Sequence, residues 1–99
     1  MISDPHAAIR DLVFATVFDG PGQTDPALRR AVADGKAVPP DLAALVEKIH
    51  RHAYKVTDED LARLRATYDD DRLFELVVSA AIGASRIRLA AGLAALEGA

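Results

Sequence analysis

The sequence predicts an all-α protein, and three observations support this fold class. Apolar residues recur every three to four positions in five separate segments. A proline or an acidic residue stands at the start of each segment, as is typical of helix N-termini. No stretch alternates apolar and polar residues for long enough to form a strand, and no internal repeat is present. The 99 residues are enough for one domain with one core.

The first two predicted helices occupy the N-terminal third of the chain. The first covers residues 4–18, where Pro5 suits the first helical turn, and the glycine-rich turn at residues 19–22 ends it. The second covers residues 26–33 and ends at Gly35. Each begins with an Asp-Pro pair, which combines an N-cap with a proline that needs no hydrogen-bond acceptor.

Two further helices follow a pair of prolines. Residues 40–54 form the third helix, because Pro40 is compatible only with a first turn. Thr57 starts a short fourth helix, and Asp60 three residues later gives a pattern close to a capping box. The apolar faces of these two helices consist of Leu42, Leu45, Val46, Ile49, Ala53, Leu61, Leu64 and Tyr68.

The fifth predicted helix, residues 70–96, is the longest and is apolar on nearly every side. It would be about 39 Å long, whereas a compact domain of this size is roughly 34 Å across. Four short helices cannot cover it, so we expect a homo-oligomer assembled through this C-terminal helix. Ser79 and Gly83 lie on one face and permit a close helix crossing. The alternative is that Gly83 and Gly92 mark a kink or a frayed end.

Composition and charge exclude several classes of function. The chain has no cysteine, which excludes disulfides, thiolate metal sites and cysteine nucleophiles. The net charge of −3 and the pI of about 5.5 lack the basic character of nucleic-acid-binding proteins, so we expect no nucleic-acid partner.

The sequence also predicts a cytoplasmic protein without a membrane partner. Residues 1–15 have no basic region followed by the continuous apolar stretch of a signal peptide. The most apolar segment, residues 76–84, is followed by Arg86 and Arg88. It is shorter than the roughly 18 residues that a membrane-spanning helix needs.

Residues 40–96 resemble the alkylhydroperoxidase D-like, or carboxymuconolactone decarboxylase, family of all-helical proteins. The resemblance is carried by HRHAY at the end of the third predicted helix, by the linker KVTDEDLARL, and by FELVVSAAIGASRIRLAAGL in the long helix. It implies a helical bundle, here of five helices, in which the long helix takes part in oligomerisation.

The resemblance also implies what this chain cannot do. Family members with peroxidase activity have a Cys-x-x-Cys-x-x-x-His motif before the linker, and its positions fall at about Pro40, Ala43 and Glu47 here. Without the cysteines, thiol peroxidase chemistry is excluded. The family's decarboxylase branch does not need them. The resemblance therefore implies a structural or small-ligand-binding oligomer or, alternatively, a cofactor-free lyase or isomerase.

Titratable residues concentrate at the end of the third helix. Glu47 and His50 have the i, i+3 spacing that di-iron sites use twice, whereas this chain has it once, with Glu75 as the one candidate for a bridging carboxylate. A hydrogen-bonded Glu47–His50 pair is the structural alternative. His50 suits a general base and Tyr54 a proton donor. We therefore take Glu47, His50, His52 and Tyr54 as candidate catalytic residues, with no cofactor and no metal required.

Charged residues near the long helix have several interpretations. Glu75 lies among apolar residues and needs a partner if it is buried, for which we expect Arg72 or Lys48. Otherwise it marks a solvated helix edge. Arg86 and Arg88 have three alternative interpretations: they bind an anion, they contact another subunit across an interface, or they are ordinary surface residues.

Overall fold

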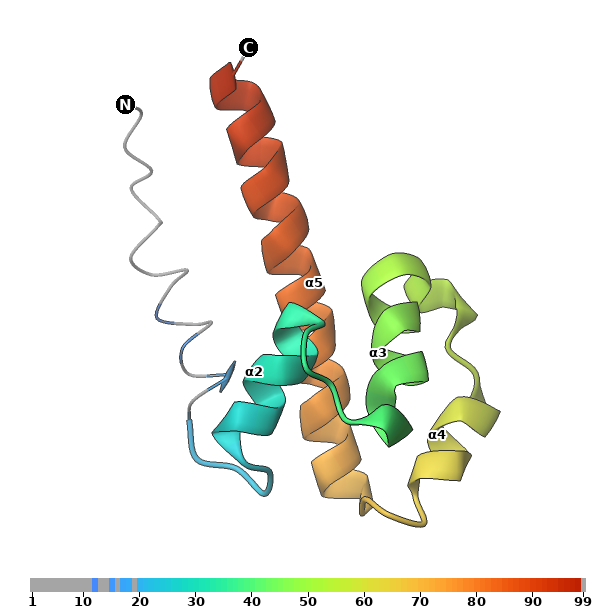
Figure 1. The fold of residues 1–99 in the computed structure, drawn as a ribbon. Coiled ribbons are helices and arrows are strands. Elements are labelled where there is room, and N and C mark those ends of the chain that lie inside the picture. The colour runs from blue at the N-terminus through green and yellow to red at the C-terminus, as the bar shows by residue number, and fades with distance from the viewer. Residues whose placement is uncertain (1–11, 13–14, 16, 19, 99) are drawn as a thin grey trace.

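The structure, a computed structural model, describes residues 12, 15, 17–18 and 20–98, and most of these are helical (Figure 1). Its elements are α2 (Pro26–Asp34), α3 (Pro40–His52), the 3₁₀ helix η1 (Ala53–Lys55), α4 (Asp58–Leu64) and α5 (Asp70–Gly98). No strand occurs among these residues, so the all-α prediction is confirmed for them. The helix predicted at residues 4–18 lies largely outside the described residues.

Local capping determines where α2 begins and ends. The Asp25 carboxylate accepts a hydrogen bond from the backbone N–H of Ala27, at 2.9 Å. At the other end, Gly35 has a φ of +66°, a left-handed conformation that favours glycine, and its N–H donates to the carbonyl of Ala31. Both predicted ends of this helix are confirmed, to within one residue.

The predicted capping box at the start of α4 is also present. The Thr57 hydroxyl accepts from the N–H of Asp60 at 3.3 Å, and the Asp60 carboxylate accepts from the N–H of Thr57 at 2.9 Å. The preceding α3 ends two residues before the predicted boundary, at His52, because the chain tightens into η1 there. At the start of α4, both hydrogen bonds of the box form although Asp60 is shorter than the usual glutamate or glutamine.

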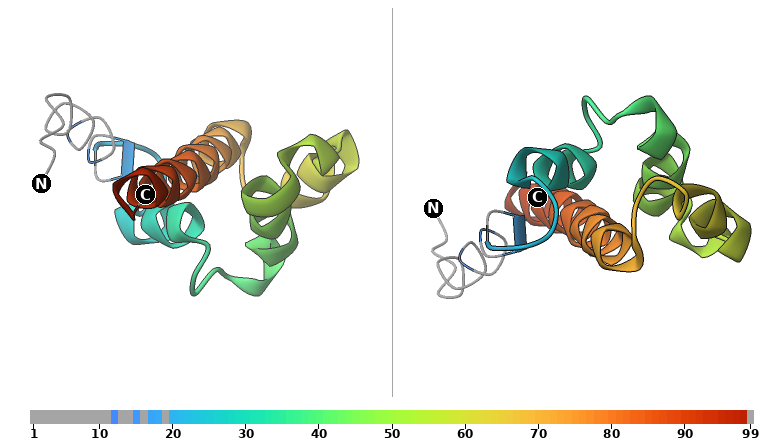
Figure 2. Two further views of the ribbon diagram at one scale, coloured as in Figure 1. Left: turned by 90° about the horizontal axis from the view of Figure 1, so that it is seen from above. Right: turned by 90° about the horizontal axis from the view of Figure 1, so that it is seen from below.

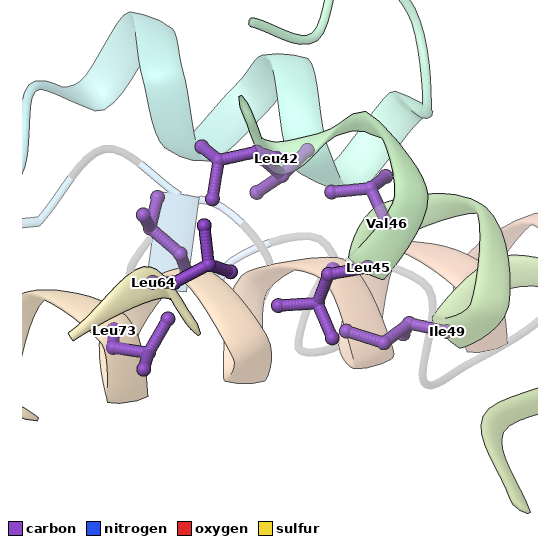
Figure 3. Close-up of a cluster of buried hydrophobic side chains, with 9 residues drawn as sticks. Leu42, Leu45, Val46, Ile49, Leu64 and Leu73 are labelled. Atoms are coloured by element: carbon purple, nitrogen blue, oxygen red, sulfur yellow. The ribbon is translucent and has the colours of Figure 1, made fainter. Parts of the chain in front are cut away.

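The hydrophobic core lies where α2, α3 and α4 meet the first half of α5 (Figure 3). It contains all four of the large aliphatic residues predicted for α3, and fully burying each such side chain contributes about 1.5–3 kcal/mol. The buried members are Val32, Leu42, Leu45, Val46, Ile49, Leu64, Leu73, Leu76 and Ala80.

A close crossing joins α2 to α5. A Cβ atom added at Gly83 would lie 2.2 Å from the carbonyl oxygen of Ala33 and 2.4 Å from its Cα, so only glycine fits. Ser79 is 1% exposed beside it. The predicted close packing at these small residues is confirmed, and the neighbour is α2 of the same chain.

The second half of α5 extends away from the other described helices (Figure 1), and the molecule measures 48 × 28 × 21 Å. From Ser85 to Gly98 every residue is exposed except the half-buried Leu93. The rest of the described chain therefore covers only the first half of this apolar helix.

By length and composition, α5 could also cross a membrane. Its most apolar 18 residues have a mean hydropathy of 1.5, and 28% of them are buried in the protein. The core helix of a soluble protein meets the same criterion. Arg86 and Arg88 lie in the middle of this helix, and an arginine at a bilayer centre costs about 2.5–3.5 kcal/mol.

Candidate functional site

A cleft of about 530 Å³ lies between the C-terminal end of α2 and the second half of α3. Carboxylates, an arginine and a histidine line it together with aliphatic side chains. The lining residues are Asp34, Gly35, Val38, Ala43, Val46, Glu47, His50 and Arg51. Two of the four predicted site residues, Glu47 and His50, thus share one cleft.

His50 is held in the cleft by a hydrogen bond to α2. Its Nε2 lies 2.8 Å from the carbonyl oxygen of Val32. A carbonyl can only accept, so Nε2 carries the proton and the neutral ring has its lone pair on Nδ1. Val32 is among the last four residues of α2. The carbonyl oxygens of these residues receive no hydrogen bond from a backbone N–H within the helix. The imidazole therefore caps α2 from the neighbouring helix.

Two other groups fix the position of His50. The ring packs on Gly35, where an added Cβ would lie 3.4 Å from Nε2. The guanidinium of Arg88, on α5, donates to the backbone carbonyl of His50. Arg88 therefore makes its contact within the chain, at the C-terminal end of α3, where a cation also complements the helix dipole. His50 connects three helices.

Glu47 and Arg51 form a weak ion pair at the edge of the cleft. Glu47 Oε1 and Arg51 Nε are 3.9 Å apart, and the two side chains are 68% and 73% exposed. Such an exposed pair contributes at most about 1 kcal/mol, so a ligand can displace it. The predicted hydrogen bond between Glu47 and His50 is wrong, because His50 bonds to Val32 instead.

His52 and Tyr54 lie outside the cleft. Their rings make an edge-to-face contact with centroids 5.8 Å apart, and Tyr54 is 81% exposed. The reason is that α3 ends at His52 and the chain turns through η1, which moves Tyr54 off the face that carries His50. The structure therefore divides the four candidates into a cleft pair and a separate surface pair.

Glu75 binds a loop that the sequence did not indicate as its partner. Its Oε1 accepts from the N–H of Gln23 at 2.7 Å, and its Oε2 accepts from the N–H and the hydroxyl of Thr24 at 2.8 and 3.0 Å. The pKa of Glu75 is lowered, and the hydrogen bond from the Gln23 N–H is the largest cause. Partial burial acts in the opposite direction and raises the pKa, whereas the positive charge of Arg29 lowers it further.

Both predicted partners of Glu75 are therefore wrong. Arg72 pairs with Asp69, and Lys48 pairs with Asp60 at 2.8 Å. The one sequence signal for the true contact is Gly22, because a Cβ there would lie 2.4 Å from Glu75 Oε1. A glycine at that turn lets the loop close around the carboxylate.

The arrangement offers no complete metal site within the described ranges. No group of three or more histidine, aspartate or glutamate side chains converges there. Glu47 and His50 would provide two ligands at most, and both oxygens of Glu75 are already bound to the Gln23–Thr24 loop.

No family model, curated protein or solved structure matches this chain.

Proposed function

We propose that this protein is a cysteine-less alkylhydroperoxidase D-like protein that binds a small molecule in the cleft at His50. The family part of the proposal is supported by the helix order, in which α3 is followed by a linker, the short α4 and the long α5. The Thr57–Asp60 capping box at the end of the linker agrees with the sequence pattern on which the resemblance depends.

The cleft itself is the observation that carries the binding proposal. Its volume of about 530 Å³ lies within the range of small-molecule sites. His50 is held by Val32 and Arg88, so one polar group of the site is preorganised. The long ion pair to Glu47 leaves the Arg51 guanidinium able to turn and bind a carboxylate of the ligand. The carboxylates of Glu47 and Asp34, which also line the cleft, can accept hydrogen bonds from donor groups of the ligand.

The test is a titration of the ¹⁵N-labelled chain with a panel of small carboxylic acids, including a lactone carboxylate. We expect saturable shifts of backbone amide signals at residues 34–38 and 43–51. Arg51→Gln should weaken binding at least tenfold, whereas Arg63→Gln, an exposed change on α4, should not. Saturable shifts that map elsewhere, or none with any acid, contradict the proposal.

A second candidate is an acid–base enzyme of the carboxymuconolactone decarboxylase kind, which needs no cofactor. The tautomer of His50 favours it, because Nε2 is committed to Val32 and Nδ1 keeps a lone pair that can accept a proton. Glu47, in the same cleft, would assist. His52 and Tyr54 have no part in this version because they lie outside the cleft.

His50→Gln tests the second candidate with little effect on the fold. The glutamine amide can still donate to the Val32 carbonyl, but it cannot act as a base. Deuterium incorporation next to the carbonyl of a lactone carboxylate in D₂O should fall at least 100-fold, while ligand-induced amide shifts remain. Unchanged exchange in this variant, or no exchange in the native protein, overturns the enzymatic role and leaves the binding proposal intact.

A further inference from the structure

A second cleft, of about 300 Å³, lies where α2 and the segment before it meet the first half of α5. In both views of Figure 2, α2 and the turn that precedes it lie beside α5. The apolar residues of the described lining are Val17, Pro21, Phe74 and Val78, and the polar ones are Arg29, Glu75 and Ser79. Among the described residues, none lines both this cleft and the one at His50, so the two clefts are separate.

Arg29 is a buried arginine with an unused hydrogen-bond donor. The residue is 4% exposed. Its Nη1 donates to the carbonyl of Val17 at 2.9 Å, and its Nη2 donates to the carbonyl of Gly20 at 2.6 Å. Its Nε is buried and has no hydrogen-bond partner among the described residues. A buried N–H without an acceptor costs free energy, and more so on a charged group. The unused donor therefore indicates that an acceptor oxygen binds beside it.

The charge of Arg29 is already balanced within this cleft. Glu75 carries the opposite charge, and the Gln23–Thr24 loop holds both of its carboxylate oxygens in place. A ligand carboxylate beside Arg29 would also lie close to Glu75, and the two negative charges would repel each other. The cleft therefore favours an acceptor oxygen that carries no charge.

We propose that this cleft binds a small, uncharged carbonyl compound with an apolar ring, whose oxygen accepts a hydrogen bond from Arg29 Nε. The size of the cleft agrees with such a ligand. A cavity of about 150 Å³ can hold benzene. About 300 Å³ is therefore enough for a phenyl ring that carries a ketone or an amide group.

The lining provides contacts for both parts of the ligand. Pro21 and Val78 offer apolar surface to the ring, and the Phe74 ring can pack against it edge-to-face or offset-stacked. Phe74 is 69% exposed, so its side chain is free to change rotamer and admit the ligand to Arg29. The hydroxyl of Ser79 can donate a second hydrogen bond to a polar group of the ligand.

The first test follows the Arg29 Nε–H signal of the ¹⁵N-labelled full chain during a titration with acetophenone. We expect a saturable downfield shift of this proton, because it gains an acceptor, and shifts of backbone amide signals at residues 20–24 and 74–79. Toluene has the same ring without the carbonyl group. It should bind about tenfold more weakly and leave the Nε–H proton unshifted.

Benzoate tests the requirement for an uncharged ligand, because it combines the same ring with a carboxylate. It should leave the Arg29 Nε–H proton unshifted. Three results overturn the proposal: no shift of this proton with acetophenone, equal affinity for acetophenone and toluene, or the same shift with benzoate as with acetophenone.

A variant that fills the cleft tests where acetophenone binds. Val78→Phe places a phenyl ring at the cleft and should weaken the binding of acetophenone by about tenfold or more. Ala81→Phe is the matched control, because it adds a phenyl ring at an exposed position of the same helix that does not line the cleft. It should bind acetophenone with native affinity.

Circular dichroism of both variants establishes that they are folded. Native affinity in a folded Val78→Phe overturns the proposal, and so do acetophenone-induced amide shifts confined to residues 34–51, which would place the ligand in the cleft at His50. If Val78→Phe does not fold, the response of the native Arg29 signal to acetophenone and toluene decides.

Discussion

At the residue scale, two glycines of α5 have contrasting surroundings. Gly83 lies against the backbone of Ala33, whereas nothing lies within 4 Å of a Cβ added at Gly92. We expect Gly83→Ala to lower the free energy of unfolding by about 1–3 kcal/mol, because α2 must move away. Gly92→Ala should raise it by up to about 1 kcal/mol through helix propensity. Urea unfolding of both variants, followed by circular dichroism, checks the pair. Equal effects would contradict the close crossing.

The carboxylate of Glu75 provides a second prediction at this scale. Glu75→Gln keeps the shape but replaces one acceptor oxygen with an NH₂ group that faces backbone donors. The free energy of unfolding at pH 7 should fall by about 1–3 kcal/mol. The native pKa of Glu75 is lowered, so its ionised form stabilises the fold above the unfolded-state pKa, and this contribution is lost as the pH falls through the native pKa.

Urea unfolding at several pH values tests this dependence. The difference between the native chain and Glu75→Gln should shrink as the solution is acidified. Glu97→Gln, an exposed change near the end of α5, serves as the control and should have no effect at any pH. If the difference in free energy of unfolding between the native chain and Glu75→Gln stayed constant across the pH range, the Gln23–Thr24 loop would not depend on the negative charge of Glu75.

At the element scale, α3 and α4 are joined by an ion pair. Lys48 Nζ lies 2.9 and 2.8 Å from the two carboxylate oxygens of Asp60, which also accepts from Thr57. The Lys48 hydrogen bond, followed by that of Thr57, lowers the pKa of Asp60 from 3.8 to about 2. Stability from this carboxylate is therefore complete above about pH 4 and is lost as the pH falls towards 2.

The Asp60→Asn variant should be less stable than the native chain at pH 7 and closer to it near pH 2. Thermal unfolding across this range is the measurement. Asp58→Asn changes an exposed carboxylate of the same helical turn and should not show this convergence. If both variants respond alike, the ion pair with Lys48 does not determine the acid sensitivity of α4.

At the scale of the whole molecule, the long apolar helix α5 raises the question of whether the protein binds a membrane. Its hydropathy permits membrane insertion, but Arg88 is bound to the carbonyl of His50 on α3, and insertion would break that contact. We expect the chain to stay in the supernatant when phosphatidylcholine vesicles are sedimented. Co-sedimentation that persists at high salt would contradict this expectation.

Local signals explain how much of the fold could be predicted. The caps at Asp25, Gly35 and Thr57 act within four residues, so their helix ends were identified correctly. The small residues at Ser79 and Gly83 correctly indicated a close crossing. Ser79 and Gly83 did not indicate that the helix packed against them is α2, because small residues in α5 permit a close approach without specifying which helix makes it.

The candidate site shows the same limit. Helical spacing placed Glu47 and His50 on one face, and the structure confirms that both line one cleft. The spacing could not show that α3 ends at His52, so it grouped Tyr54 with a site from which the 3₁₀ turn separates it.

By itself, the sequence determined the helical class, the order of the helices and most of their ends, because periodicity and capping act between residues a few positions apart. Tertiary structure alone decided the partners of the polar groups. Glu75 binds Thr24 51 residues away, His50 binds Val32 18 residues away, and Arg88 binds His50 across 38 residues. Such contacts depend on how whole helices pack, and helix packing is set by the burial of apolar surface, which does not specify which polar groups meet.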